Sequence, residues 1–301
     1  MTTLSSAEAF AAYEAARKRL PNPAEGKGPP RMIDTLKEVT CDFDVFLLDA
    51  FGVLNIGDSP IAGTPERVRD LQAAGKRVLV VSNAASVSRD ELLHKYARLG
   101  YAFAPDDVIT SRMAAAAGCT EKPDMRWGVM GLSGKSMDDF GTLNWHLLED
   151  DPEAYSRADG FLLIGSGEWT AVRQTMMKEE LERRPRPVKV ANPDIVAPRE
   201  NGFSVEPGCF AHELAETTGL SPVFYGKPFK NIYDLVFERL GGAQSTRIAM
   251  VGDSLHTDIL GAHVAGISSI LISDFGFFAG QDFEGAIAQS RIVPDYVARR
   301  P

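Results

Sequence analysis

The sequence has no long apolar run and no leader-like segment at its start. Its apolar runs, such as 78–81 and 161–164, have the length of strands, whereas a helix needs roughly 20 apolar residues to cross a bilayer. We therefore expect no membrane span and no membrane partner. Glu8 and Glu14 precede any basic cluster in the first thirty residues, and no apolar segment of a secretory signal follows. These features predict a cytoplasmic location.

Cysteine is scarce, with only Cys41, Cys119 and Cys209 in the chain. The number is odd and the three lie far apart, so the sequence offers neither a disulfide framework nor the paired spacing of a zinc site. We expect buried thiols in a reducing compartment.

Basic residues are outnumbered by acidic ones, 32 against 41, which gives a formal net charge of −9. Such a balance argues against a nucleic-acid-binding surface, which needs a basic patch. An acidic protein that binds phosphate esters must offset its own field locally, with a metal ion, a lysine or helix N-termini.

What the chain does have is enough apolar material for a core. Its 301 residues are 44% hydrophobic, which suffices for one large or two modest domains. Ser5 and Ser6 can cap a helix that runs to about Leu20, and residues 25–30 have the composition of a linker. We expect this arm, residues 1–30, to pack on the body of the protein, with a mobile or partner-binding arm as the alternative.

A regular alternation of strands and helices begins near residue 44. Apolar runs of strand length alternate with segments of helical apolar spacing. The predicted strands are 45–48, 78–81, 108–110, 223–225, 248–251 and 269–272, and the predicted helices are 64–74, 88–99, 231–240 and 257–265. This order predicts an α/β fold with a doubly wound parallel sheet, in which ligands bind at the carboxyl ends of the strands.

The middle of the chain has its own alternation. Strands are predicted at 127–132, 160–164 and 188–191, with helices at 169–183 and 210–218. The economical interpretation is a core domain formed by residues 31–112 and 221–301, with an α/β domain of residues 113–220 inserted into it.

Polar residues follow several of the predicted core strands. Asp49 and Ser82-Asn83 come after the first two, and Lys227 follows the strand at 223–225. Asp253 and Asp258 straddle a strand end and a helix start, where two carboxylates can converge on one hard cation. Each piece alone is equally compatible with helix capping or a solvated loop, but their conjunction at one sheet edge favours a phosphate site.

In this order and spacing the four pieces resemble the motifs of the haloacid dehalogenase (HAD) superfamily. The insertion between Ser82 and Lys227, together with Ala191-Asn192-Pro193-Asp194, resembles the class IIA branch, whose members include nitrophenyl-phosphate and pyridoxal-phosphate phosphatases. The resemblance covers the chain beyond about residue 30. It implies a Rossmann-like core with an inserted cap domain, and pairing of two copies through their caps.

The resemblance also implies roles for these residues. Asp49 would attack phosphorus and form an aspartyl-phosphate, with Lys227 as the second catalytic residue. Ser82, Asn83 and Lys227 would bind the phosphoryl oxygens of a small phosphorylated metabolite, and Asn192 and Asp194 would order the cap hinge or touch the substrate. The implied Mg²⁺ ligands are Asp49, the backbone carbonyl of Phe51 and Asp253, with Asp258 either as a further ligand or as a residue that supports the ligands.

Phe51 departs from the pattern of the phosphatases in this superfamily. They carry at this position a second aspartate, which protonates the leaving oxygen and later activates water, and phenylalanine cannot move a proton. General acid–base help contributes typically ~10²–10⁴ in rate, so we expect either a good leaving group or a substitute proton carrier, for which His256 is the candidate.

Two alternatives stay open. A protein that retains the pocket without turnover would be a binding or regulatory protein, and Phe51 is compatible with that. A C–halogen hydrolase needs no acid for a halide leaving group, but the pair Asp253 and Asp258 argues against it.

Overall fold

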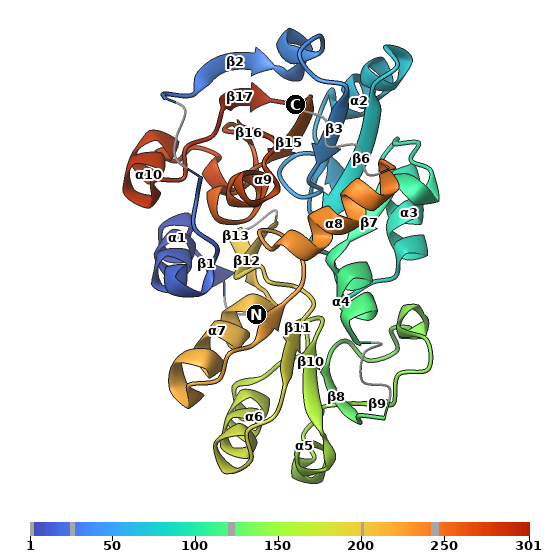
Figure 1. Cartoon of the computed structure of the whole chain (residues 1–301), viewed down its shortest axis with the longest axis vertical. Helices are drawn as coiled ribbons and strands as arrows, with labels where there is room; N and C mark the ends of the chain where they lie inside the picture. Colours follow the sequence, from blue (N-terminus) through green and yellow to red (C-terminus); the bar gives the residue numbers. More distant parts are fainter. Residues whose placement is uncertain (1–2, 25–27, 120–123, 200–201, 242–246) are drawn as a thin grey trace.

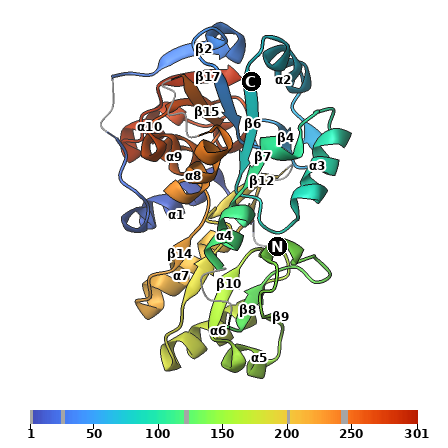
Figure 2. The ribbon, with the colours of Figure 1, turned by 45° about the vertical axis from the view of Figure 1, so that its right-hand side comes forward.

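The computed structural model of the chain describes residues 3–24, 28–119, 124–199, 202–241 and 247–301 (Figure 1). The predicted linker at 25–30 therefore lies partly outside the described residues. Two parallel sheets dominate the molecule, one in the upper and one in the lower half of Figures 1 and 2.

The upper sheet is the predicted doubly wound core. Its strands, in spatial order, are β2 (Arg31–Thr35), β17 (Tyr296–Arg300), β16 (Ser268–Ile272), β15 (Ile248–Gly252), β3 (Val45–Leu48), β6 (Arg77–Ser82) and β7 (Val108–Thr110). All neighbouring pairs among these strands are parallel. The α/β fold expected from the sequence is confirmed.

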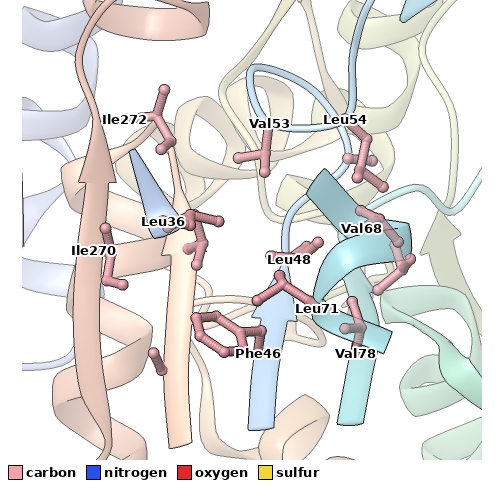
Figure 3. Packing of buried hydrophobic residues seen from close by; sticks show 14 of the residues in the cluster. Leu36, Phe46, Leu48, Val53, Leu54, Val68, Leu71, Val78, Ile270 and Ile272 are labelled. Atoms are coloured by element: carbon pink, nitrogen blue, oxygen red, sulfur yellow. The ribbon is translucent and has the colours of Figure 1, made fainter. Parts of the chain in front are cut away.

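Helices cover both faces of this sheet. The central strand β3 is therefore apolar at every position. Phe46 and Leu48 pack with Val68 and Leu71 of one layer (Figure 3). The alternate residues of β3 pack with the opposite layer, which contains Tyr233. Because successive side chains of a strand point to opposite faces, a strand covered on both sides must be apolar at every position.

The α-helices of the described residues are 6 to 13 residues long. They are α1 (Ser6–Ala15), α2 (Thr64–Ala73), α3 (Arg89–Arg98), α4 (Ser111–Cys119), α5 (Pro152–Arg157), α6 (Ala171–Arg183), α7 (Pro207–Thr218), α8 (Lys230–Arg239), α9 (Leu260–Ala265) and α10 (Phe283–Ser290). Over the part of the chain that the structure describes, no helix combines the length and apolar character that a membrane span requires.

The lower sheet is formed by the middle of the chain. Its spatial order is β14 (Val223–Phe224), β11 (Val188–Val190), β10 (Gly160–Leu163), β8 (Trp127–Met130) and β9 (Trp145–Leu147). The division of the chain into residues 31–112 with 221–301 and residues 113–220 stays a prediction.

One strand of that prediction is wrong. We expected residues 223–225 to form a strand of the core sheet, but β14 pairs in parallel with β11 of the lower sheet. The paired run is only two residues long and Val223 is half exposed, so its apolar pattern could not specify which sheet it joins. As a result, Lys227 reaches the core from a strand of the other sheet.

The N-terminal segment joins the body, as expected. Ser5 caps α1 with Glu8 in a capping box, and the helix ends at Ala15 rather than near Leu20. Ahead of it, β1 (Thr3–Leu4) pairs antiparallel with β13 (Gly202–Val205), which forms a hairpin with β12 (Val196–Arg199). Figure 1 shows α1 beside this hairpin and below α10.

Several strands escaped prediction. In β17, Val297 and Ala298 are buried but Arg299 and Arg300 follow directly, and in β2 only Ile33 is buried. Such short or alternating apolar segments resemble loops in sequence. The β12–β13 hairpin was missed for the same reason.

Buried His212 makes folding stability sensitive to acid. Its ring stacks on Phe224 with centroids 4.8 Å apart, and neither ring nitrogen has a hydrogen-bond partner among the described residues. Burial, with the nearby Arg19 charge, lowers the pKa of His212 to about 4. Below about pH 6.5 the unfolded chain binds a proton that the folded protein does not, so stability is complete above that pH and is lost as pH falls toward 4.

We predict that His212→Leu reduces this acid sensitivity. Between pH 6.5 and 4, His212 should cost wild type up to about 3 kcal/mol of unfolding free energy. The variant should not show this part of the loss when the unfolding free energy is measured from urea unfolding curves. His94→Leu, at an exposed position, is the control and should follow wild type. Equal acid sensitivity of all three proteins would contradict the prediction.

Candidate active site

Three neighbouring strands of the upper sheet deliver polar side chains to one edge. Asp49 follows β3, Asp253 follows β15, and Ser82 is the last residue of β6. Because β15, β3 and β6 are adjacent and parallel, their carboxyl ends meet at the same edge of the sheet. The backbone N–H of Asp49 still donates to the carbonyl of Val251, 2.9 Å away, so the carboxylate stands on the rigid end of the sheet.

Lys227 lies between two of the carboxylates. Its Nζ is 2.6 Å from Oδ1 of Asp49 and 2.7 Å from Oδ1 of Asp258, and the lysine is 1% exposed. Burial disfavours the ammonium charge, but Asp258 and Asp49 outweigh this and hold the pKa of Lys227 above its ordinary value. The lysine is therefore a fixed positive charge beside Asp49.

Asn83 fixes the backbone of that lysine. Its Oδ1 accepts the N–H of Lys227 at 2.8 Å, and its Nδ2 donates to the carbonyl of Lys227 at 2.9 Å. The preceding Gly226 has φ +116, and a Cβ there would lie 2.5 Å from Oδ1 of Asn83. Only glycine permits both that backbone conformation and that close approach.

Asp258 is held by the turn that follows β15. Its Oδ2 accepts the backbone N–H groups of Asp253 and Ser254, each at 3.1 Å, and its Oδ1 faces Lys227. The segment Leu255–Ile259 forms a π-helical turn before α9, where the sequence predicted ordinary helix. Both carboxylate oxygens of Asp258 therefore already have partners in the protein.

Asp253 occupies a narrow space beside Gly52, in the loop that follows Asp49. Its Oδ2 accepts the N–H of Phe277 at 2.7 Å. Gly52 has φ +78, and a Cβ at that position would lie 2.2 Å from the same oxygen. A larger residue at 52 would displace the carboxylate, so this glycine is required for the geometry of the acid cluster.

The clustered acids favour a positive ligand. Asp49, Asp253 and Asp258 each offer a carboxylate oxygen within 4.8 Å of the others. Burial raises the pKa of Asp49 to about 6, against the opposing effect of Lys227. Burial first, then the charges of Asp258 and Asp49, raise the pKa of Asp253. Three carboxylates against one lysine leave a net negative site of hard oxygen donors, which fits a divalent cation such as Mg²⁺.

A cavity of about 280 Å³ opens above these groups. Its wall includes most of the predicted site residues, namely Asp49, Phe51, Ser82, Asn83, Asn192, Asp194, Lys227 and Asp253. Asp258 is fully buried and contacts Lys227 of this wall. The structure thus brings together the site residues that the sequence placed on two different parts of the chain.

Asn192 and Asp194 form a turn in the cavity wall. Oδ1 of Asn192 accepts the N–H of Asp194 at 3.0 Å, and its Nδ2 donates to Glu206 at 3.2 Å. Oδ1 of Asp194 accepts from Nδ2 of Asn83 at 2.7 Å. Both amide hydrogens of the Asn83 side chain are thereby used, so this side chain positions Lys227 and Asp194 and leaves no amide hydrogen for a phosphate.

The Phe51 side chain lies between two cations. Nζ of Lys95 is 4.9 Å from the ring centroid, and Cζ of Arg199 is also 4.9 Å from it. Such cation–π contacts stabilise an aromatic ring at a partly exposed position. The side chain holds no group that can carry a proton, as the sequence indicated.

His256 does not replace the missing aspartate. It is 1% exposed, is absent from the cavity wall, and stacks on Tyr13 with its Nε2 2.6 Å from Oε1 of Glu14. The proposal that this histidine is the substitute proton carrier is therefore wrong. The π-helical turn directs the side chain toward α1, a direction that ordinary helical spacing did not predict.

Some residues of the cavity wall were missed by the sequence analysis. Tyr13 comes from α1, Lys95 from α3, and Arg199 and Glu206 from the hairpin and its exit. Nothing in the sequence around Arg199 marks it. For Tyr13, its place on the buried stripe of a capped helix indicated only that the helix packs somewhere.

Comparison with known proteins agrees with this geometry. Residues 46–139 match the family model described as haloacid dehalogenase-like hydrolase, and residues 224–299 match a second model described as HAD-hydrolase-like. The two matched segments contain Asp49, Ser82, Lys227 and Asp253.

Curated relatives cover most of the chain. The 4-nitrophenylphosphatase of Schizosaccharomyces pombe is 26% identical over 280 residues, 86% of this chain and 92% of that protein. The human glycerol-3-phosphate phosphatase is 25% identical over 286 residues, 85% and 88% of the two chains.

Solved structures share the fold. A possible sugar phosphatase of the HAD superfamily from Cytophaga hutchinsonii superposes with a TM-score of 0.78 at 24% identity, covering 90% of this chain and 98% of that one. A p-nitrophenyl phosphatase from Archaeoglobus fulgidus gives a TM-score of 0.70 at 25% identity, covering 86% and 97%. A glycerol phosphate phosphatase from Mycobacterium tuberculosis, solved with magnesium, gives 0.69 at 24% identity, covering 87% and 76%.

Removal of Lys227 tests the ion cluster. We predict that Lys227→Met loses about 3–5 kcal/mol of unfolding free energy at pH 7, because Asp49 and Asp258 are left as buried charges without a partner. The control is Lys230→Met, since the Lys230 side chain is 70% exposed and pairs with Asp234 at the surface. It should change stability by less than about 1 kcal/mol. Equal unfolding midpoints for both variants in denaturant would contradict the prediction.

Proposed function

Because the chain belongs to the haloacid dehalogenase superfamily and is a hydrolase of its class IIA branch, we propose that it is a divalent-metal-dependent phosphohydrolase acting through Asp49. The observation that carries the proposal is the placement of Asp49 at the floor of the cavity, beside a buried lysine and a second carboxylate. A carboxylate nucleophile next to fixed positive charge suits attack on a phosphate ester.

The metal ligands follow from which oxygens are still available. Asp253 has one carboxylate oxygen without a protein partner among the described residues, Asp49 lines the same cavity, and the Phe51 carbonyl stays a predicted third ligand. Both carboxylate oxygens of Asp258 already contact other groups of the protein. We therefore assign Asp258 the role of orienting Lys227. When bound, Mg²⁺ would neutralise the carboxylates and the charge that develops on the transferring phosphoryl group.

The remaining residues bind and orient the phosphoryl group. Lys227 supplies positive charge next to Asp49, and Ser82 offers a hydroxyl at the neighbouring strand end. Asn83 acts through Lys227, which it holds in place. Phosphoryl transfer depends mainly on such positioning and charge neutralisation, so the acidic chain supplies positive charge where the reaction needs it.

The cavity volume supports a small substrate. A space of about 280 Å³ is at the low end of ligand pockets, in keeping with a small phosphorylated metabolite. The phosphatase names of the relatives in the comparison support the same class. A homodimer paired through the inserted domain stays a prediction.

We predict that Asp49→Asn abolishes Mg²⁺-dependent hydrolysis of p-nitrophenyl phosphate. The amide is a far weaker nucleophile, so the rate should fall at least ~10³-fold. Wild type should also lose activity when the metal is removed with a chelator and regain it when Mg²⁺ is restored. Asp234→Asn, at an exposed site on α8, is the matched control and should retain wild-type kinetics.

Other outcomes would favour the alternatives. Tight binding of inorganic phosphate without turnover of any ester would support a binding or regulatory protein. Release of halide from a haloacid would support a C–halogen hydrolase. Full activity of Asp49→Asn on phosphate esters would show that the reaction runs through another group.

A further inference from the structure

Residue 51 offers no proton donor for the leaving group of the substrate. The ring of Phe51 lies between Lys95 and Arg199, at the position where the resemblance to the phosphatases of the superfamily implies an aspartate. An alkyl phosphate releases an alkoxide unless a proton arrives as the bond breaks, and positioned acids accelerate this step by typically ~10²–10⁴. For an alkyl phosphate, the proton donor would therefore have to come from elsewhere in the cavity wall.

We propose that Asp194 is the general acid and base that replaces the missing aspartate. The inference rests on the proposed phosphohydrolase function and extends it to the proton transfers. Asp194 lines the same cavity as Asp49, Ser82 and Lys227, although it is 145 residues from Asp49 in sequence. Unlike a surface carboxylate, it is partly buried and is held by contacts with several segments of the chain.

Hydrogen bonds fix the position of Asp194 relative to Asp49. Nδ2 of Asn83 donates to Oδ1 of Asp194 at 2.7 Å, and the Asn83 side chain also forms two hydrogen bonds with the backbone of Lys227. Lys227 in turn contacts Asp49 at 2.6 Å. On the other side, Oδ1 of Asn192 accepts the Asp194 N–H. The carboxyl group thus has a fixed position relative to the attacking atom.

The second oxygen of Asp194 is available to carry a proton. In the described part of the chain, Oδ2 has no hydrogen-bond partner, and no lysine, arginine or histidine nitrogen lies within ion-pair distance of either oxygen. Oδ1, by contrast, is occupied as an acceptor. A proton on this carboxyl group would therefore reside on Oδ2, in the wall of the cavity.

The environment of Asp194 favours its protonated form. Burial is the main cause that raises its pKa, to about 8, and Asp49 and Glu206 add to the rise. The Asn83 hydrogen bond and Lys227 oppose it. At neutral pH the group is then largely an acid, and a pKa close to the working pH suits a residue that both gives and takes a proton.

The N-terminal arm contributes to this environment. The hydroxyl of Tyr13 accepts the backbone N–H of Ile195, the residue after Asp194, at 3.1 Å. Tyr13 is 2% exposed and lines the cavity, so α1 shields the turn that carries Asp194 from water. Tyr13 is a positioning residue in this account.

The other acids of the wall are engaged elsewhere. Glu206 pairs with Arg199 at 3.2 Å and accepts from Ser204 at 2.6 Å. Asp58 pairs with Lys95 at 3.1 Å. The pKa of Tyr13 is raised well above its ordinary value by burial and by Asp194, which makes its phenol a poor proton donor at neutral pH.

The two proton transfers balance the reaction. An oxygen of Asp49 bonds to phosphorus as the bond from phosphorus to the leaving oxygen breaks, and the proton on Oδ2 of Asp194 moves to that oxygen to release an alcohol. Water then attacks the phospho-aspartate and gives a proton to the Asp194 carboxylate. The bond between phosphorus and Asp49 breaks, which frees inorganic phosphate and restores both residues.

Asp194→Asn tests this assignment with substrates of graded leaving-group ability. Asparagine keeps the shape and still accepts from Asn83 through its carbonyl oxygen, but it cannot exchange the proton. We expect kcat/KM for an alkyl phosphate to fall about 100-fold or more, and that for p-nitrophenyl phosphate to fall less than about 5-fold, since nitrophenolate leaves without a proton. For wild type, the alkyl reaction should also decline as pH rises through about 8.

Glu206→Gln is the matched control, because it neutralises another buried carboxyl group of the same wall. It should change kcat/KM for both esters by similar factors. Similar losses on both esters in Asp194→Asn, with its thermal midpoint unchanged, would mean that Asp194 only positions other groups. Unimpaired alkyl hydrolysis would also overturn the proposal. If wild type hydrolyses neither ester with Mg²⁺, the proposed function itself fails, and the inference fails with it.

Discussion

The contact of Lys227 with Asp49 and Asp258 is the interaction on which the rest of the site depends. Burying an ammonium group costs several kcal/mol unless it is paired, and so does burying a carboxylate. The chain meets this cost with Asn83, which fixes the lysine backbone, and with the turn after β15, whose N–H groups hold Asp258. The position of Asp49 is therefore determined by both sheets, because Asp49 follows a strand of one and Lys227 a strand of the other.

That dependence explains how far the sequence could predict the site. Asp49, Ser82 and Asp253 were predictable because each follows an apolar strand, and parallel strands end at a common edge. Lys227 was predicted correctly as a site residue but assigned to the wrong sheet, since the two-residue β14 carries too little pattern to specify its neighbour. The α/β fold was predictable from long, fully apolar strands such as β3.

The rest could not be predicted because it depends on contacts between distant segments. The hydrogen bond between Asn83 and Asp194 joins residues 111 positions apart, and no local pattern encodes it. Tyr13 meets Ile195 across an even longer separation. The direction of His256 depends on one π-helical turn, which changes the face on which a side chain emerges. Local spacing can identify the strands that carry a site, whereas the residues that complete it from other elements require the three-dimensional structure.

The N-terminal arm and the β12–β13 hairpin both form part of the cavity wall. They are joined by the pairing of β1 with β13, and both contribute residues to the cavity above Asp49. Phe51 fits this arrangement as part of the wall, between Lys95 of the core and Arg199 of the hairpin. In this account the proton-carrying group is Asp194 and not the residue at position 51.

The central claim is that phosphate is transferred to Asp49, and trapping the intermediate tests it most directly. The enzyme would be quenched in acid during turnover of p-nitrophenyl phosphate with Mg²⁺, digested, and analysed by mass spectrometry. The account predicts one added phosphoryl group on the peptide that contains Asp49, which is lost on treatment with hydroxylamine. Steady turnover with no phosphorylated form of that peptide, or with the phosphoryl group on another residue, would contradict it.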